Sequence, residues 1–349
     1  MSYRKRLERD LDRWIGAGHV GANKRAAMLA MVEEPRRLDA ATALAYVGAV
    51  LLGLAIIAFV AANWDGLPRL ARFLIVLALF ATAVGGAAWA ADRNRAGLAN
   101  GLATLAALIF AAAVGLIGQI FDIAGDPARA LIGSGVAAAL LSLAGRSTGA
   151  GIAALVLIGL GDAQLRGDGL WWLLFASLLA ALAAWSWRSG ALAHAASLAL
   201  IVSVAWLCGQ AEGSVGWFLL ATAVATGLAA VARWRAGESE VFPTFYGWAV
   251  WGALIFLVGA GIERFDTGPE MIPHRLAWLA AAGGAIALGR HDRHGMVTAG
   301  GVIFLIGAIA ALLADLGVDL MTAAALFLVC ALVALVGGLM LRRAGKPAP

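Results

Sequence analysis

The chain has 349 residues, of which 62% are apolar and only 13% are charged, and its mean hydropathy is +0.87. Soluble domains average about 45–50% apolar and about 25% charged residues. No soluble fold of this length could bury so much apolar surface, so the composition predicts a membrane protein. The formal net charge of +5 does not indicate nucleic-acid binding, because the basic residues stand at the ends of apolar runs, where membrane topology places them.

Other features of the composition bear on the compartment. Cys208 and Cys330 both lie inside apolar runs, so we expect small buried side chains and no disulfide framework. Residues 1–39 are polar and show no cleavage-site pattern at a usable distance, so we expect the first apolar run to act as an uncleaved insertion signal. Alanine richness and a preference for arginine over lysine suggest a GC-rich bacterial genome, and we expect the bacterial inner membrane.

Residues 1–39 are predicted to form a small helical hairpin in the cytoplasm. Apolar residues recur there at the spacing of one face of an amphipathic helix, at Leu7, Leu11, Trp14 and Ile15. Residues 16–18 end that helix, and a second helix is predicted for residues 23–32 with Asn23 as its N-cap. The head is basic, so anionic lipid headgroups are its expected partner at the membrane surface. A lipid- or protein-sensing module is the alternative interpretation.

Twelve apolar runs follow the head, and each is long enough, or nearly so, for a spanning helix of about 17–25 residues. They are continuous rather than alternating, which excludes barrel strands. The predicted fold is an all-α polytopic transmembrane bundle, with residues 40–341 in the membrane and 342–349 as a tail. The predicted spans are 40–62, 69–90, 98–121, 128–145, 147–164, 169–187, 190–211, 214–234, 244–262, 273–289, 295–315 and 318–341. The fifth, which is rich in glycine, could instead be broken or re-entrant.

The charge distribution predicts the orientation of the bundle. With twelve spans and a cytoplasmic N-terminus, most of the 26 Lys and Arg residues fall on the inside, whereas the acidic residues divide almost evenly. This bias is the one that the positive-inside rule requires, so both termini are predicted to be cytoplasmic. Tryptophans cluster near both predicted membrane edges, including Trp185 and Trp234 at the inner edge, as in an aromatic belt.

Two similar polar turns on the predicted outer face supply the candidate site. Each turn contains an amide, an aromatic residue, a carboxylate, a proline and then an arginine. The candidate substrate-binding residues are Asn63, Trp64, Asp65, Arg69, Arg72, Gln119, Phe121, Asp122, Asp126 and Arg129. A third turn, from Arg264 to Leu276, contains a related set.

Three interpretations of these turns remain open. Aspartate and proline start helices well, so the pattern could be hairpin punctuation alone. It could reflect an ancestral duplication of helical hairpins. The turns could also converge into an outward-facing polar pocket. Arg72 lies one turn inside the membrane edge, where a charge is costly, so it should find a carboxylate or extend outward to the interface.

Motifs for catalysis or metal binding are absent from the sequence. The glycine pairs lie inside apolar runs and form no nucleotide-binding loop, and we expect no cofactor. The segment His291–His294 is better explained as a positive-inside anchor than as a metal site. His194 and Ser197 share a helix face without a third partner, so no catalytic residue is predicted.

Small residues recur in the predicted helices, as in the glycine pairs at 283–284 and 300–301. Such positions let helix backbones approach closely, which explains tight packing within one bundle. The same faces would also allow a homo-oligomer.

Two blocks of the sequence carry a family resemblance. The first runs from Ala49 to Leu74 and includes Ala61-Ala62-Asn63-Trp64-Asp65, and the second is Gly118-Gln119-Ile120-Phe121-Asp122-Ile123-Ala124-Gly125-Asp126. With the head, they resemble bacterial membrane proteins grouped as a domain of unknown function, number 2157, over roughly residues 5–190. The resemblance implies a multi-pass inner-membrane protein and brings no substrate or catalytic residue.

The sequence therefore favours an integral membrane protein that transports or handles a small solute or lipid in an outward-facing polar pocket. A non-transporting scaffold or an envelope sensor that uses the N-terminal head is the alternative. An intramembrane enzyme is the least favoured of the three. The lipid bilayer is the expected partner, and nucleic acid is not expected.

Overall fold

The computed structural model of the chain describes residues 3–31, 66–120, 125–165, 170–262, 271–318, 321–322 and 328. Throughout these residues the regular structure is helical, which confirms the predicted all-α class. The chain divides into two compact units, Met1–Pro68 and Arg69–Pro349. The predicted first and last spans, 40–62 and 318–341, fall wholly or almost wholly outside the described residues, as does the predicted boundary at residue 39.

Unit 1 contains the predicted helical hairpin. Helix α1 spans Tyr3–Gly16, a 3-10 turn spans Ala22–Lys24, and helix α2 spans Arg25–Ala30. On the predicted apolar face of α1, Leu11 is fully buried, whereas Trp14 is exposed. The chain leaves α1 through Gly18 at a φ of 75°, a conformation that glycine adopts at little cost.

One detail of the predicted head is wrong. Asn23 does not cap the second helix, because it lies inside the 3-10 turn that the Lys24 N–H closes on the Gly21 carbonyl at 2.9 Å. Lys24 is the N-cap of α2, and its side chain makes no capping hydrogen bond. An ion pair joins α1 to α2: Arg25 Nε donates to Asp12 Oδ1 at 2.8 Å. This hydrogen bond holds the pKa of Asp12 below its ordinary value.

The described part of unit 2 is a succession of antiparallel helices that follow the ten middle spans predicted from the sequence, to within two residues at either end. They are α4 (Arg69–Asp92), α5 (Ala96–Ile120), α6 (Pro127–Gly145), α7 (Thr148–Gln164), α8 (Trp171–Trp187), α9 (Gly190–Gln210), α10 (Ser214–Trp234), α11 (Phe242–Ile262), α12 (Ile272–His291) and α13 (Gly295–Asp315). Continuous apolar runs fix these bounds, because polar turn residues interrupt each run.

Seven of the described helices are long and apolar enough to cross a membrane: α4, α5, α6, α9, α10, α11 and α13. Helices α7 and α8 are apolar but shorter, at 17 residues each. The glycine-rich α7 runs unbroken from Thr148 to Gln164, which favours a plain short helix over a broken one. A polytopic helical membrane protein therefore fits the described structure.

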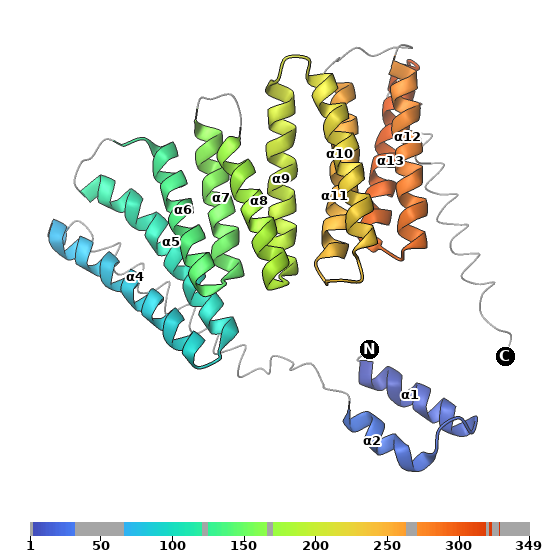
Figure 1. The fold of residues 1–349 in the computed structure, drawn as a ribbon, viewed down its shortest axis with the longest axis horizontal. Coiled ribbons are helices and arrows are strands. Elements are labelled where there is room, and N and C mark those ends of the chain that lie inside the picture. The colour runs from blue at the N-terminus through green and yellow to red at the C-terminus, as the bar shows by residue number, and fades with distance from the viewer. Residues whose placement is uncertain are drawn as a thin grey trace. The chain divides into compact units, whose positions relative to one another are not determined.

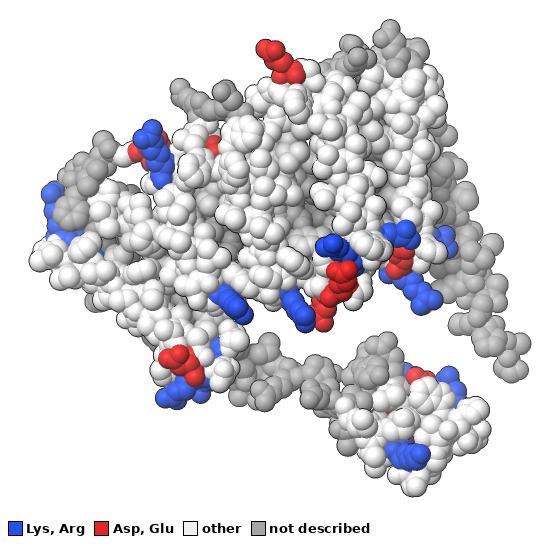
Figure 2. Space-filling model, in the orientation of Figure 1, with Lys and Arg blue, Asp and Glu red and all other residues white. Residues whose placement is uncertain are grey.

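Helical hairpins organise unit 2. The pairs α4–α5, α6–α7, α8–α9, α10–α11 and α12–α13 each pack along their length and follow one another in chain order (Figure 1). The second helices, α5, α7, α9, α11 and α13, also pack each against the next and connect successive hairpins. The turns within the hairpins lie at one end of unit 2, which we call the arginine end, and the other turns lie at the opposite end. Figure 2 shows that charged side chains gather at these two ends, with an uncharged band between them.

Most turns at the arginine end share one backbone conformation. Four of them place a non-glycine residue in the left-handed region, with φ between 47° and 55°, at Asn94, Arg146, Arg188 and Arg293. In three turns the next residue caps the following helix with its side chain, at Ser147, Ser189 and His294. The left-handed residue ends one helix and the cap begins the next, which explains why these connectors are so short.

Glycine allows close helix contact at some of the predicted positions and not at others. A Cβ on Gly301 of α13 would lie 2.7 Å from the Ile286 backbone nitrogen and 2.8 Å from the Ala282 carbonyl oxygen of α12. Only glycine permits so close a backbone approach. By contrast, a Cβ on Gly283 or Gly284 would meet no described atom within 4 Å, so the close-packing interpretation does not hold there.

Candidate functional site

The end of the second polar turn of the predicted outer pocket, residues 125–129, is described and leads into α6. Asp126 is the N-cap of α6 and accepts a hydrogen bond from the Ala128 N–H at 2.9 Å, while Pro127 occupies the first turn. Arg129 forms an ion pair with Asp126 at 3.3 Å, and its side chain is 84% exposed. Asp126 and Pro127 therefore start a helix, as the punctuation interpretation predicts.

Of the other candidate residues, only Arg69 and Arg72 have side chains that the structure describes. Asn63, Trp64, Asp65, Phe121 and Asp122 lie outside the described residues, as does the side chain of Gln119. Arg69 is exposed and Arg72 is half-buried in the first turn of α4, and both take part in interactions. Their convergence with the acidic residues of the two turns stays a prediction.

A buried ion pair lies at the opposite end, between the start of α12 and the end of α13. Arg275 Nε donates to Asp315 Oδ2 at 2.7 Å, and the two side chains are only 11% and 1% exposed. Charged groups in membrane helices are costly to bury, so they pair with one another and usually mark functional sites. This pair is the most deeply buried charge cluster in the described chain.

His274 extends the cluster toward α11. Its Nε2 lies 2.8 Å from the Leu257 carbonyl oxygen, which can only accept, so Nε2 carries the proton and Nδ1 is left as an acceptor. Arg275 Nη1 lies 3.4 Å from that Nδ1. A Cβ on Gly261 would collide with His274 and reach within 3.0 Å of Arg275 Nη1, so the close approach of three helices fixes both side chains.

Two buried polar atoms near the α12–α13 contact have no hydrogen-bond partner among the described residues: Asp315 Oδ1 and Trp278 Nε1. Asp315 thus offers a second carboxylate oxygen to a donor, and Trp278 offers an indole N–H to an acceptor. Leaving such groups unsatisfied costs about 1–3 kcal/mol each. The cluster could therefore bind a small polar group.

The arginine end holds a second polar network, built from the segment that the sequence analysis considered as a metal site. Asp292 accepts hydrogen bonds from Arg233 and from the Tyr246 hydroxyl, and His294 caps α13. Arg233 holds the pKa of Asp292 below its ordinary value, because the guanidinium stabilises the carboxylate. No cluster of His, Cys, Asp and Glu residues in the described parts of the chain could hold a metal ion.

The remaining histidine that the sequence singled out also has a structural partner. His194 Nδ1 accepts a hydrogen bond from Trp248 Nε1 at 2.8 Å, which joins α9 to α11. The ring is therefore occupied in a helix contact, and the geometry gives no support for a nucleophile activated by His194.

Sequence reasoning missed Asp315 as a site residue. Its position offered a signal, since it ends an apolar run whose hairpin partner begins with Arg275. Antiparallel registration of the two runs brings the end of one beside the start of the other. The orphaned atoms and the burial could be seen only in the structure.

One comparison with known proteins gives a match. A family model described as "Predicted membrane protein (DUF2157)" matches residues 12–151, which is less than half of the chain. The match includes both polar turns before α4 and α6. No curated protein and no solved structure matches the chain. Residues 12–151 are therefore similar to the predicted membrane proteins of this family, which confirms the resemblance that the sequence blocks indicate.

Proposed function

We propose that the protein transports or handles a small polar solute or lipid that it binds at the opposite end of unit 2. The observation that supports this most directly is the buried Arg275–Asp315 pair with its unsatisfied carboxylate oxygen. A bundle that needed only stability would gain little from such a pair, because apolar residues of similar volume often serve as well or better. The predicted pocket from Asn63 to Arg129 remains a separate part of this proposal.

The proposed location is the bacterial inner membrane, with the arginine end in the cytoplasm and the opposite end outside. Arginines recur in the described turns at one end, as the positive-inside rule requires of cytoplasmic loops. The solute would then enter the binding site from the outer side of the membrane.

A non-transporting scaffold or sensor is the second candidate, and one observation favours it. The head belongs to unit 1, apart from helices α4–α13, is closed by the Asp12–Arg25 ion pair, and exposes Trp14 and Met28 beside basic residues. Such a surface is suited to anionic lipid headgroups. In this case unit 2 would anchor the head and bind no solute.

Solute binding can be tested by thermal unfolding of the purified protein in lipid nanodiscs. A panel of amino acids, amines, carboxylates and phospholipids is added, since a ligand that binds only the folded state raises the unfolding temperature. The double variant Arg275→Gln/Asp315→Asn removes both charges and so leaves no unpaired buried ion. It should lose the stabilisation that the wild type gains from its ligand.

Asp162→Asn is the matched control. Asp162 is also a buried carboxylate near the opposite end, but its Oδ2 caps α8 through the Leu173 N–H at 2.9 Å. Asparagine can accept the same bond, so this variant should keep the response. If no compound stabilises the wild type, or the double variant responds equally well, the solute-handling proposal fails and the scaffold interpretation is favoured.

A further inference from the structure

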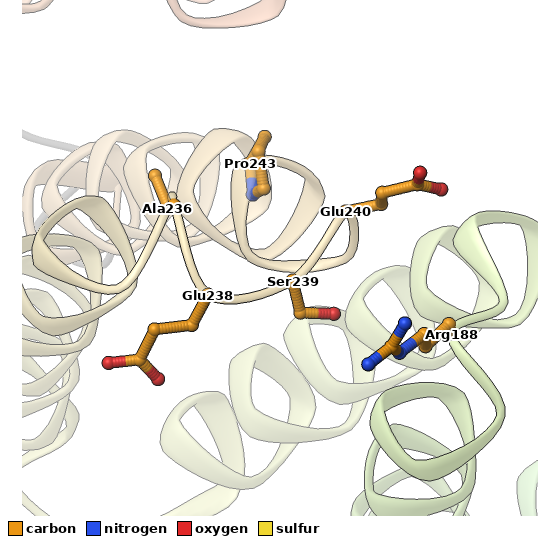
Figure 3. A pocket seen from close by; sticks show the side chains of 7 residues that line it. Arg188, Ala236, Glu238, Ser239, Glu240 and Pro243 are labelled. Carbon is orange, nitrogen blue, oxygen red and sulfur yellow. The ribbon is translucent and has the colours of Figure 1, made fainter.

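A pocket of about 410 Å³ lies at the arginine end, between the α8–α9 turn and the α10–α11 loop. It is distinct from the Arg275–Asp315 cluster, which lies at the other end of the helices. Its polar lining comes from Arg188 on the turn and from Glu238, Ser239 and Glu240 on the loop. Figure 3 shows the Arg188 guanidinium and the Ser239 hydroxyl directed toward each other, with Glu240 on the same side of the loop as Arg188.

Two donors in this pocket are not engaged by the protein. Ser239 Oγ is buried and has no hydrogen-bond partner in the described structure. Arg188 is exposed, and no ion pair joins it to a carboxylate within the parts of the chain that are described. A guanidinium facing a hydroxyl provides several N–H donors and one O–H donor, which is a suitable set for phosphate oxygens.

The pocket lies at the ends of membrane-length helices, where lipid headgroups are expected. Arg188 directly follows α8, and residues 235–241 join the spanning helices α10 and α11. At the same end of the helices, Trp185 and Trp234 are 52% and 81% exposed. Exposed tryptophans at helix ends are typical of the membrane–water interface, so a phospholipid phosphate would reach the pocket from the adjoining bilayer.

The charges of the pocket select among headgroups. One arginine and two glutamates give the lining a net negative charge, which disfavours a purely anionic headgroup. A headgroup with a phosphate and an ammonium satisfies both signs, since the phosphate can lie between Arg188 and Ser239 and the ammonium beside Glu240. We propose that this pocket binds a phospholipid with a zwitterionic, amine-bearing headgroup of the phosphatidylethanolamine class.

Native mass spectrometry of the full chain tests the proposal. The protein is released from nanodiscs that contain equal amounts of phosphatidylethanolamine and phosphatidylglycerol, and the retained lipids are counted. The wild type should retain the ethanolamine lipid preferentially. Arg188→Gln should reduce that retention about fivefold, the effect of about one basic contact at the membrane surface.

Arg146→Gln is the matched control, because Arg146 occupies the same left-handed position in the α6–α7 turn but does not line this pocket. Its lipid retention should equal that of the wild type. Ser239→Ala should weaken retention without changing the preference between the two lipids. Glu240→Gln should remove the preference, because the ammonium loses its carboxylate while the phosphate contacts remain.

Soluble phosphoethanolamine distinguishes a lipid from a free headgroup, and at millimolar concentration it should leave lipid retention unchanged. Displacement of the lipid by this compound would overturn the assignment to a membrane lipid. Equal retention of both lipids by the wild type, or equal loss of lipid in the Arg188 and Arg146 variants, would overturn the assignment of this pocket as a lipid-binding site.

Discussion

Asp292 accepts two hydrogen bonds from Arg233, from Nε at 2.6 Å and from Nη2 at 2.7 Å. The paired geometry joins the last turn of α10 to the α12–α13 connector. The Tyr246 hydroxyl on α11 donates a third bond to Asp292 Oδ2 at 2.9 Å. A single carboxylate thus holds the ends of three helices together.

Asp292→Asn should lower the unfolding temperature at neutral pH, because asparagine cannot accept the paired bonds from Arg233. Tyr246→Phe tests the third bond alone and should cost about 1.5 kcal/mol, as expected for a hydrogen bond to a charged group. Thermal unfolding in nanodiscs measures both changes. If Asp292→Asn unfolds at the wild-type temperature, the network contributes nothing to stability.

The same pair predicts a pH dependence. The pKa of Asp292 lies below its ordinary value in the folded state, so the folded protein binds this proton less readily than the unfolded chain. The stabilisation is therefore complete above the unfolded-state pKa of about 4, and it is lost as the pH falls through the lower folded-state pKa. The difference between wild type and Asp292→Asn should be full at pH 7 and should shrink steadily below about pH 4. A difference that stays constant down to pH 3 would contradict this account.

Asn100 of α5 should be important for stability, because it connects two hairpins. Its Oδ1 accepts hydrogen bonds from Ser147 Oγ at 2.9 Å and from the Gly149 N–H at 3.0 Å, at the start of α7. Asn100→Leu leaves the Gly149 N–H without its acceptor and leaves Ser147 Oγ only the Asn100 backbone carbonyl at 3.2 Å, so it should cost about 1–3 kcal/mol. Asn100→Asp keeps the acceptor and should cost less. Denaturant unfolding of the two variants measures the difference, and equal costs would show that size rather than hydrogen bonding matters at this position.

The sequence predicted the helices well and the contacts between them poorly, for a physical reason. A bilayer requires long apolar runs, and turn residues such as Ser147 and Ser189 interrupt these runs clearly. The partner of a polar side chain depends on how separate hairpins pack. Nothing in the neighbourhood of Asn100 indicates that it meets a helix start 47 residues later. The pairing of Arg233 with Asp292, 59 residues apart, is equally invisible to periodicity.

Alanine substitution of glycines in the α12–α13 hairpin should have opposite effects at two positions. Gly301→Ala places a Cβ against the backbone of Ile286 and Ala282, which cannot move aside like a side chain, and should cost about 1–3 kcal/mol. Gly284→Ala meets no described atom within 4 Å and should stabilise its helix by up to about 1 kcal/mol. Thermal unfolding of the two single variants decides the matter. Destabilisation by Gly284→Ala would indicate a neighbour at that face, as in a homo-oligomer.

The arginines with a left-handed backbone conformation should lower the stability of the folded protein and help to set its orientation in the membrane. Arg146 and Arg188 have φ values of 47° and 55°, where a side chain is strained and glycine is preferred. Arg146→Gly should therefore raise the unfolding free energy of the purified protein by about 0.5–1 kcal/mol. Arginine at these turns is explained if its charge orients the hairpins during insertion.

A reporter fusion measures the effect of these arginines on membrane orientation. Alkaline phosphatase fused after Pro349 is active only outside the cytoplasm, so the wild-type fusion should be inactive. Replacing Arg146, Arg188 and Arg293 together by glycine should leave a fraction of chains inverted and give measurable phosphatase activity. The triple lysine variant keeps the charge and the strained backbone, so it should match the wild type in both orientation and stability. An active wild-type fusion would place the tail outside and contradict the proposed orientation, while a glycine variant as well oriented as the wild type would show that these arginines do not set it.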